Sequence, residues 1–193
     1  MIQKLSGESG NLWAEHLKKM LREGVRRWRE EDGVIYFEVT SNGRTGLEWI
    51  EYLETPVFQV DKWAKDVLMS PDFKPTNGVI YRIAVIKGTL FSASDRITKK
   101  IRAEAKSRKL EKPNAEVVCL IRDAFSNEEL KAMGLWEIVV FHDSIRDSAG
   151  GPRLLAVFRG FGGRWLHAYC DRPDVFWFSG CGFAFAVSQV SSN

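Results

Sequence analysis

Two histidines and two aspartates in the C-terminal third of the chain are the side chains best suited to acid–base chemistry. His142 and Asp143 are adjacent, Asp147 follows four residues later, and His167 lies on another strand-like segment. A carboxylate beside an imidazole can hold the ring in one tautomer and tune its charge, as general acid–base catalysis requires. These four residues are therefore the candidate catalytic set, provided that the fold brings His167 to the loop that carries the other three.

The same residues also have a purely structural interpretation. Residues 147–151 read Asp-Ser-Ala-Gly-Gly, which is ordinary turn chemistry, and a histidine or aspartate at a strand end usually completes the hydrogen bonds of a turn. A metal site of His142 and His167 with Asp143 or Asp147, to which Cys170 or Cys181 can be added, is an alternative, but the spacing matches no metal-binding motif. The sequence therefore predicts no bound metal and no cofactor.

Four cations on one predicted helix form a second candidate site. They stand at spacings of three, four and three residues, opposite the apolar edge of the helix, and are Lys99, Arg102, Lys106 and Lys109. Between residues 94 and 112 there are eight Lys or Arg and three Asp or Glu, a local net charge of +5 against +3 for the whole chain. This concentration favours a contact with nucleic-acid phosphates, although a surface helix also needs a polar face for solvation alone.

A third candidate, for anion binding, follows the first predicted strand. Arg44 and Thr45 stand at the N-terminus of the next predicted helix, where backbone N–H groups can hold an anion. Thr45 and Glu48 also match a capping box, in which each side chain accepts a hydrogen bond from the other residue's backbone. Because the chain has neither a P-loop nor a dinucleotide-binding motif at this point, the helix cap is the simpler interpretation.

Aromatic residues are dense in the last part of the chain. Trp165, His167 and Tyr169 alternate along one predicted strand, so their side chains share a face. Aromatic rings on a sheet can stack on nucleic-acid bases or anchor a protein partner, but they also build ordinary sheet cores. Exposure of this face would favour the binding interpretation.

The N-terminal region predicts an amphipathic helix that ends at Asp32-Gly33. Apolar residues recur at helical spacing from Trp13 to Trp28 and place two tryptophans on one stripe. Such a stripe has to be buried, and a second copy of the chain can bury it where the domain does not. We therefore expect a homodimer formed through residues 13–28.

The remaining pattern predicts an α+β fold with a mostly antiparallel sheet packed by several helices. Residues 115–125 read as a helix, with a buried strand as the alternative, and a capping box predicts a helix over residues 127–133. From Trp136 onward, four strand-like segments separated by Gly-, Pro- and Asp-rich connections predict an antiparallel meander. We expect a single domain over residues 1–193, divided into an N-terminal helix (1–32), a mixed part (33–135) and the meander (136–193).

Composition limits the class of protein. Hydrophobic residues make up 45% and charged residues 27% of the 193-residue chain, as in ordinary globular proteins. No apolar run approaches the ~20 residues that span a bilayer, and the first residues lack the pattern of a secretory signal, so a cytoplasmic protein without a membrane segment is expected. Three cysteines without a CxxC pair argue against a disulfide scaffold.

None of the motifs identifies a family, a substrate or a reaction. The lack of a strong catalytic pattern favours a non-enzymatic binding or accessory module that contacts nucleic acid through Lys99, Arg102, Lys106 and Lys109. The alternative is a small hydrolase or nuclease that uses His142, Asp143, Asp147 and His167. These two hypotheses differ in whether the two histidines meet in one cleft.

Overall fold

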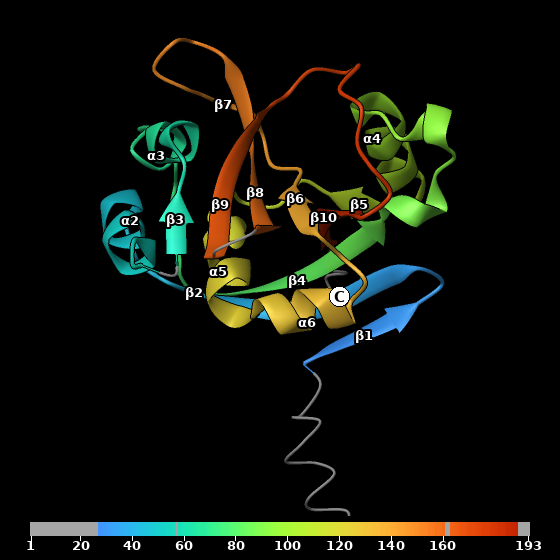
Figure 1. Ribbon diagram of the computed structural model, residues 1–193, viewed down its shortest axis with the longest axis horizontal. Coiled ribbons are helices and arrows are strands. Elements are labelled where there is room, and N and C mark those ends of the chain that lie inside the picture. The colour runs from blue at the N-terminus through green and yellow to red at the C-terminus, as the bar shows by residue number, and fades with distance from the viewer. Residues whose placement is uncertain (1–26, 57, 161–162, 189–193) are drawn as a thin grey trace, which may run out of the picture.

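The computed structural model describes residues 27–56, 58–160 and 163–188, in which one large mixed sheet runs through the molecule (Figure 1). The strand order is β1-β2-β4-β10-β6-β8-β9-β3, with β5 beside β10 and β7 beside β8. Among these strands, β6 with β10 and β3 with β9 pair in parallel, and the other pairs are antiparallel, which fits an α+β fold. The strands are β1 (Trp28–Glu31), β2 (Val34–Asn42), β3 (Phe58–Val60), β4 (Asn77–Lys87), β5 (Leu110–Glu111), β6 (Glu137–Val140), β7 (Ile145–Arg146), β8 (Pro152–Gly160), β9 (Gly163–Cys170) and β10 (Cys181–Val187).

The chain enters the sheet at Trp28, which corrects the predicted end of the N-terminal helix. Asp32 and Gly33 have φ angles of 50° and 73°, and a two-residue hairpin turn of type I′ requires positive φ at both of its central positions. Trp28 pairs with Phe37 across the resulting hairpin of β1 and β2. The rest of the predicted helix, and with it most of the expected homodimer contact over residues 13–28, lies outside the described residues.

The predicted C-terminal meander is correct for three strands and wrong for the fourth. β6, β8 and β9 pair antiparallel in chain order. β10 instead lies between β4 and β6, antiparallel to the first and parallel to the second. Its first five residues are all buried, as expected for a central strand covered on both faces. The connection over residues 171–180 carries the chain from β9 back to this central place (Figure 1).

Three of the five described helices begin at a side-chain cap, and two of these caps are capping boxes. The helices are α2 (Gly46–Leu53), α3 (Lys62–Leu68), α4 (Thr98–Ser107), α5 (Val117–Ala124) and α6 (Asn127–Ala132). Capping boxes at Thr45 and Ser126 start α2 and α6, as predicted, and Gly134 has the left-handed φ of 77° expected after α6. The helix predicted over residues 115–125 is also confirmed, as α5.

Three arginines from separate segments bind the C-terminal end of α5. Arg27 donates to the carbonyl oxygen of Ala124, and Arg122 and Arg164 both donate to that of Phe125. Cations at this end complement the helix dipole and satisfy carbonyl groups that have no partner within the helix. Burial, together with the neighbouring charge of Arg164, lowers the pKa of Arg122 to about 9. This contact ties β1, α5 and β9 together.

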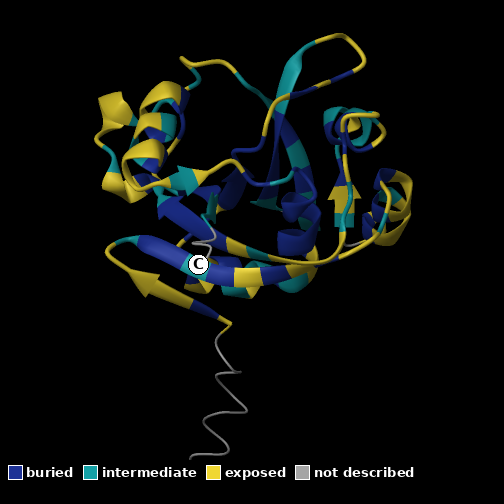
Figure 2. Cartoon of the chain, turned by 180° about the vertical axis from the view of Figure 1, so that it is seen from behind, coloured by how far each residue is buried: buried dark blue, intermediate teal, exposed yellow. Residues whose placement is uncertain are grey.

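Two hydrophobic cores lie on the two faces of the sheet, because successive strand residues point to opposite sides. Along β6, Ile138 and Val140 belong to the core formed with α2, α3, α5 and α6. Val139 belongs to the other core, which contains Ile101 and Ala105 of α4. Figure 2 shows the buried residues concentrated in the central strands, whereas β1 at the edge is mostly exposed.

No helix in the described part of the chain combines the length and the apolar character that crossing a bilayer requires.

Candidate functional site

His167 of β9 and Asp61 form a side-chain pair that the sequence did not predict. The imidazole Nδ1–H donates to Asp61 Oδ2, which also accepts from the backbone N–H of Ala168 at 3.0 Å. Asp61 Oδ1 accepts from the N–H of Ala64 at 2.7 Å, so the carboxylate is the N-terminal cap of α3. The parallel pairing of β3 with β9 brings Asp61 to His167, because Asp61 directly follows β3. Backbone donors therefore fix the carboxylate of Asp61, and this carboxylate in turn orients the imidazole.

Aromatic rings hold the His167 imidazole on both sides. The rings of Trp165 and Tyr169 stack on it at centroid distances of 5.8 and 5.9 Å, and Phe158 of β8 meets it edge-on at 5.8 Å. The side chain of His167 is 35% exposed. Within the described residues, its Nε2 atom has no hydrogen-bond partner, so this nitrogen is left for water or a ligand. The face shared by Trp165, His167 and Tyr169 is thus half-buried rather than sealed in the core.

The charges of Asp61 and His167 support each other. The hydrogen bond that His167 donates to Asp61 raises the pKa of His167 above its usual value, burial opposes this rise, and the charges of Asp61 and Glu137 add to it. Burial by itself raises the pKa of Asp61, but the hydrogen bonds from His167, Ala64 and Ala168 outweigh burial and lower that pKa. Because Asp61 accepts the Nδ1 proton, the proton that the pair can take up and release is the one at Nε2.

A buried carboxyl group lies next to this pair, on the same face of the sheet. Glu137 of β6 is 1% exposed and accepts hydrogen bonds from the Tyr169 hydroxyl at 2.8 Å and from the Cys181 thiol at 2.9 Å. Burial raises the pKa of Glu137 above its usual value, and the hydrogen bonds from Cys181 and Tyr169 and the charge of His167 offset this rise only in part. Burial and the neighbouring Glu137 raise the pKa of Cys181, so this thiol is a poor nucleophile.

His142 has a structural environment. It is 1% exposed; its Nδ1 lies 2.6 Å from the carbonyl oxygen of Asp143, and its Nε2 accepts from the N–H of Leu155 at 3.0 Å. Because the N–H of Leu155 can only donate, the ring proton resides on Nδ1. Burial lowers the pKa of His142 to about 4. Both ring nitrogens are thus occupied in the neutral form.

The two aspartates of the predicted catalytic set lie in separate surroundings. Asp147 accepts from the N–H groups of Ala149 and Gly151, both at 2.8 Å, and forms an ion pair with Arg153. Asp143 is largely exposed and pairs with Lys112. Among the described residues, no hydrogen bond or ion pair joins His142, Asp143 or Asp147 to His167. The structure therefore brings none of these three into direct contact with His167.

Of the four cations predicted to lie on one helix, three lie on α4 and one lies beyond its end. Lys99 and Lys106 are exposed on the helix, whereas Arg102 donates to both carboxylate oxygens of Asp171. Lys109 lies beyond the end of α4, with a left-handed φ of 57°. The described residues offer no ion-pair partner to Lys99 or Lys106, so these two remain available to an anionic ligand.

At the predicted anion site, Thr45 caps α2 and Arg44 packs on aromatic rings. The Arg44 guanidinium lies 4.0 Å from the ring centre of Tyr52 and 4.9 Å from that of Trp49. Thr45 Oγ1 accepts from the N–H of Glu48 at 3.3 Å. Both side chains thus have structural contacts.

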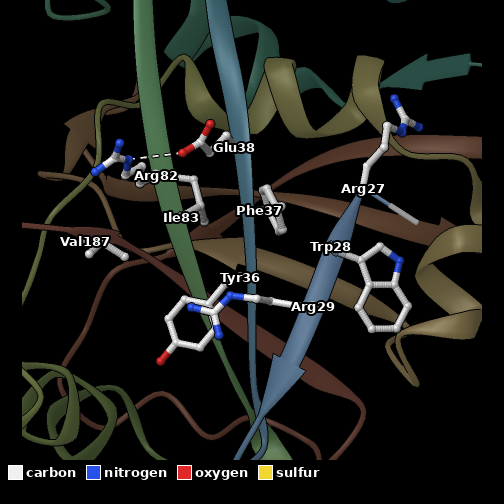
Figure 3. A pocket seen from close by; sticks show the side chains of 9 residues that line it. All are labelled: Arg27, Trp28, Arg29, Tyr36, Phe37, Glu38, Arg82, Ile83 and Val187. Atoms are coloured by element: carbon white, nitrogen blue, oxygen red, sulfur yellow. Dashed lines mark hydrogen bonds and ion pairs between the residues drawn. The ribbon is translucent and has the colours of Figure 1, made fainter. Parts of the chain in front are cut away.

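Two cavities in the described part of the chain have linings that include neither His167 nor Asp61. A groove of about 640 Å³ lies at the β1-β2-β4 end of the sheet, where Arg29 stacks on Tyr36 and Arg82 pairs with Glu38 (Figure 3). A second cavity of about 440 Å³ is lined by Trp136 and Gly180, which immediately precede Glu137 and Cys181. The described residues that line the groove include the Arg82–Glu38 ion pair but no histidine beside a carboxylate, so the candidate site is the pair of Asp61 and His167.

In the described part of the chain, no cluster of three or more His, Cys, Asp or Glu side chains is arranged to hold a metal ion. Sequence reasoning missed Asp61 as a partner of His167 because the two residues are far apart in the chain and β3 is only three residues long. The only signal was the position of Asp61 at the start of a helix.

No family model, curated protein or solved structure matches this chain.

Proposed function

We propose that this protein is an enzyme that uses His167, oriented by Asp61, as a general acid–base group in a hydrolytic reaction. The observation that carries the proposal is the set of hydrogen bonds to the Asp61 carboxylate, which accepts from two backbone N–H groups and from the Nδ1–H of His167. Among the described residues, the Nε2 atom of His167 has no hydrogen-bond partner. A positioned base with a second group that orients it is the arrangement general-base catalysis needs. Of the predicted catalytic set, only His167 is retained, and Asp61 takes the place of the other three residues as its partner.

The proton balance of such a reaction is simple. Neutral His167 takes a proton from an attacking water at Nε2, and Asp61 stabilises the imidazolium that forms. The hydroxide adds to an acyl or phosphoryl centre, and the imidazolium returns the proton to the leaving group. Asp61 remains ionised throughout, because its lowered pKa disfavours protonation.

The test compares three variants with the wild type on activated esters of acetate and phosphate. We expect His167→Gln to lower the turnover rate by about 100-fold or more, the usual contribution of a positioned acid–base group, and Asp61→Asn to lower it in the same direction. Glu31→Gln, at the opposite edge of the sheet, should leave the rate unchanged. Hydrolysis at equal rates in the wild type and in His167→Gln, or no hydrolysis of any of these esters, would contradict the proposal.

A second candidate function is nucleic-acid binding through α4. The observation that favours it is the exposure of Lys99 and Lys106 without ion-pair partners in the described residues, next to Arg102 and Lys109. Lysines that neutralise phosphates release counterions, so binding should weaken steeply as the salt concentration rises.

The matched test uses two double variants with the same change in charge. Lys99→Glu with Lys106→Glu should weaken binding to single- or double-stranded DNA by at least about tenfold at low salt and reduce the salt dependence. The control is Lys62→Glu with Lys74→Glu, which reverses two exposed lysines outside α4. Equal losses in both variants would reject a specific role for α4.

A further inference from the structure

Glu137 has two features that an ordinary core residue of a central strand lacks. Its carboxyl group is almost wholly buried, although an ionisable side chain at such a place is costly unless it is hydrogen-bonded. Each of its two oxygens accepts one hydrogen bond, one from the hydroxyl of Tyr169 and the other from the thiol of Cys181. Within the described residues, Glu137 forms no ion pair.

Tyr169 connects this buried carboxyl group to His167. Its hydroxyl donates to Glu137 Oε2 at 2.8 Å, and its ring lies against the imidazole of His167 at 5.9 Å with an interplanar angle of 27°. The hydrogen bond fixes the ring of Tyr169, and the ring covers one side of the imidazole. One phenol therefore contacts both ionisable groups.

We propose that Glu137 is a positioning residue for His167. It acts on the imidazole in two ways, through the ring of Tyr169 and through the charge of its own buried carboxyl group. This inference rests on the proposed function, since it assigns a second group to the same site. Glu137 does not contact the reacting atoms in this arrangement. It holds the Tyr169 ring in place and stabilises the protonated imidazole across the partly buried space between them.

The titratable groups that face His167 come from each neighbouring segment. Asp61 approaches from the start of α3, Glu137 from β6 and Tyr169 from β9, while Cys181 of β10 lies behind Glu137. Asp61 and Glu137 both raise the pKa of His167, so removal of either negative charge should lower it. Burial keeps Tyr169 and Cys181 neutral.

The test follows the His167 ring by NMR through a pH titration of the full chain, which requires no substrate. Glu137→Gln keeps the shape of the side chain and removes its charge, and should lower the pKa of His167. Tyr169→Phe removes one donor from Glu137, which raises the pKa of that carboxyl group. It should therefore lower the pKa of His167 in the same direction and weaken the ring contacts of the imidazole.

Glu116 offers a matched control in the other half of the molecule. It is also 1% exposed and accepts a hydrogen bond from a tyrosine hydroxyl, that of Tyr81 at 2.6 Å. Glu116→Gln should leave the pKa of His167 unchanged. The inference would be overturned if the pKa of His167 were unchanged in both Glu137→Gln and Tyr169→Phe. It would also be overturned if Glu116→Gln lowered the pKa of His167 as much as Glu137→Gln does.

The same titration separates this inference from the proposed function. If His167 in the wild type titrates above ~6.5 and the two variants do not move it, the positioning role of Glu137 fails while the Asp61 pair stands. If His167 in the wild type titrates at or below ~6.5, the electrostatic basis of the proposed function fails and the positioning role fails with it. If Glu137→Gln does not fold, Tyr169→Phe decides the question, because it removes a single oxygen atom and leaves the ring.

Discussion

His142 and His167 contact neighbouring residues of β8, yet their surroundings move the two pKa values in opposite directions. His142 accepts from Leu155 within the buried core, and His167 lies beside Ala156, the next residue along β8. Burial lowers the pKa of His142, whereas the carboxylate of Asp61 raises that of His167. The difference lies in one charged partner and in solvent access, two properties that residue type does not reveal.

We expect His142 to make the fold sensitive to acid. Its folded-state pKa of about 4 lies below the unfolded value of 6.5, so between these pH values the unfolded chain binds a proton that the folded chain does not. The free energy of unfolding should therefore fall by about 3 kcal/mol as the pH drops from 6.5 to 4. Urea unfolding at several pH values checks this. The stability difference between the wild type and His142→Gln should shrink toward pH 4, and a constant difference would contradict the prediction.

The Asp61 and His167 pair should stabilise the fold in a defined pH window. The raised pKa of His167 contributes stability that is complete below the unfolded value of ~6.5 and is lost as the pH rises through the folded value. The lowered pKa of Asp61 contributes stability above ~3.8 that is lost as the pH falls through its folded value. Asp61→Asn should therefore be most destabilising between about pH 4 and 6.5. Chemical denaturation at pH 5.5 and 9 measures the difference, and equal losses at both would count against the pair.

At the scale of elements, close contacts between backbones decide where α2 and α3 lie. A Cβ atom added at Gly46 would stand 1.8 Å from the carbonyl oxygen of Leu68. Gly46 is the first residue of α2, and Leu68 is the last of α3. Since α3 begins at Asp61, this contact also helps to place the carboxylate that orients His167.

Gly46→Ala should cost about 3 kcal/mol or more in unfolding free energy, because α2 and α3 have to separate to admit one methyl group. Glu51→Ala, at an exposed position of the same helix, should change stability by less than about 0.5 kcal/mol. Thermal unfolding monitored by circular dichroism compares the two variants. A loss below ~1 kcal/mol in Gly46→Ala would show that the two helices adjust without strain.

At the scale of the whole molecule, the position of β10 joins the two halves of the sheet. It pairs with β4 on one side and with β6 on the other, so the N-terminal hairpin and the C-terminal meander form one sheet instead of two. The expectation of a single domain over residues 1–193 stays a prediction. The expected homodimer through residues 13–28 stays a prediction, and its apolar stripe does not extend to Trp28, which is buried in β1.

We expect light scattering to show a dimer of the full chain at micromolar concentration. Replacing Trp13 and Leu17 by serine should give a monomer, because these residues lie on the apolar stripe of the predicted helix. Replacing Lys18 and Arg22, on the opposite face, should leave the dimer intact. A wild-type monomer at the same concentration would remove the prediction.

The sequence by itself determined the local elements of this protein. The capping boxes at Thr45 and Ser126 and the helical period over residues 115–125 depend on neighbours within a few positions, and the structure has a helix at each of the three places. For residues 115–125 the sequence left a buried strand as the alternative. Asp32-Gly33 shows the limit of such reading, because the same two residues end a helix or turn a hairpin, and only the pairing of Trp28 with Phe37 distinguishes the two.

Only the tertiary structure decided the candidate site. The predicted set joined His142, Asp143 and Asp147, which are close along the chain, to His167 on another predicted strand. The partners of His167 in the structure come from other segments. Asp61 reaches it through the parallel pairing of β3 with β9, and Glu137 through the hydrogen bond from Tyr169. Strand pairing joins residues without regard to their separation in sequence, and burial sets their charges only after the sheet has formed.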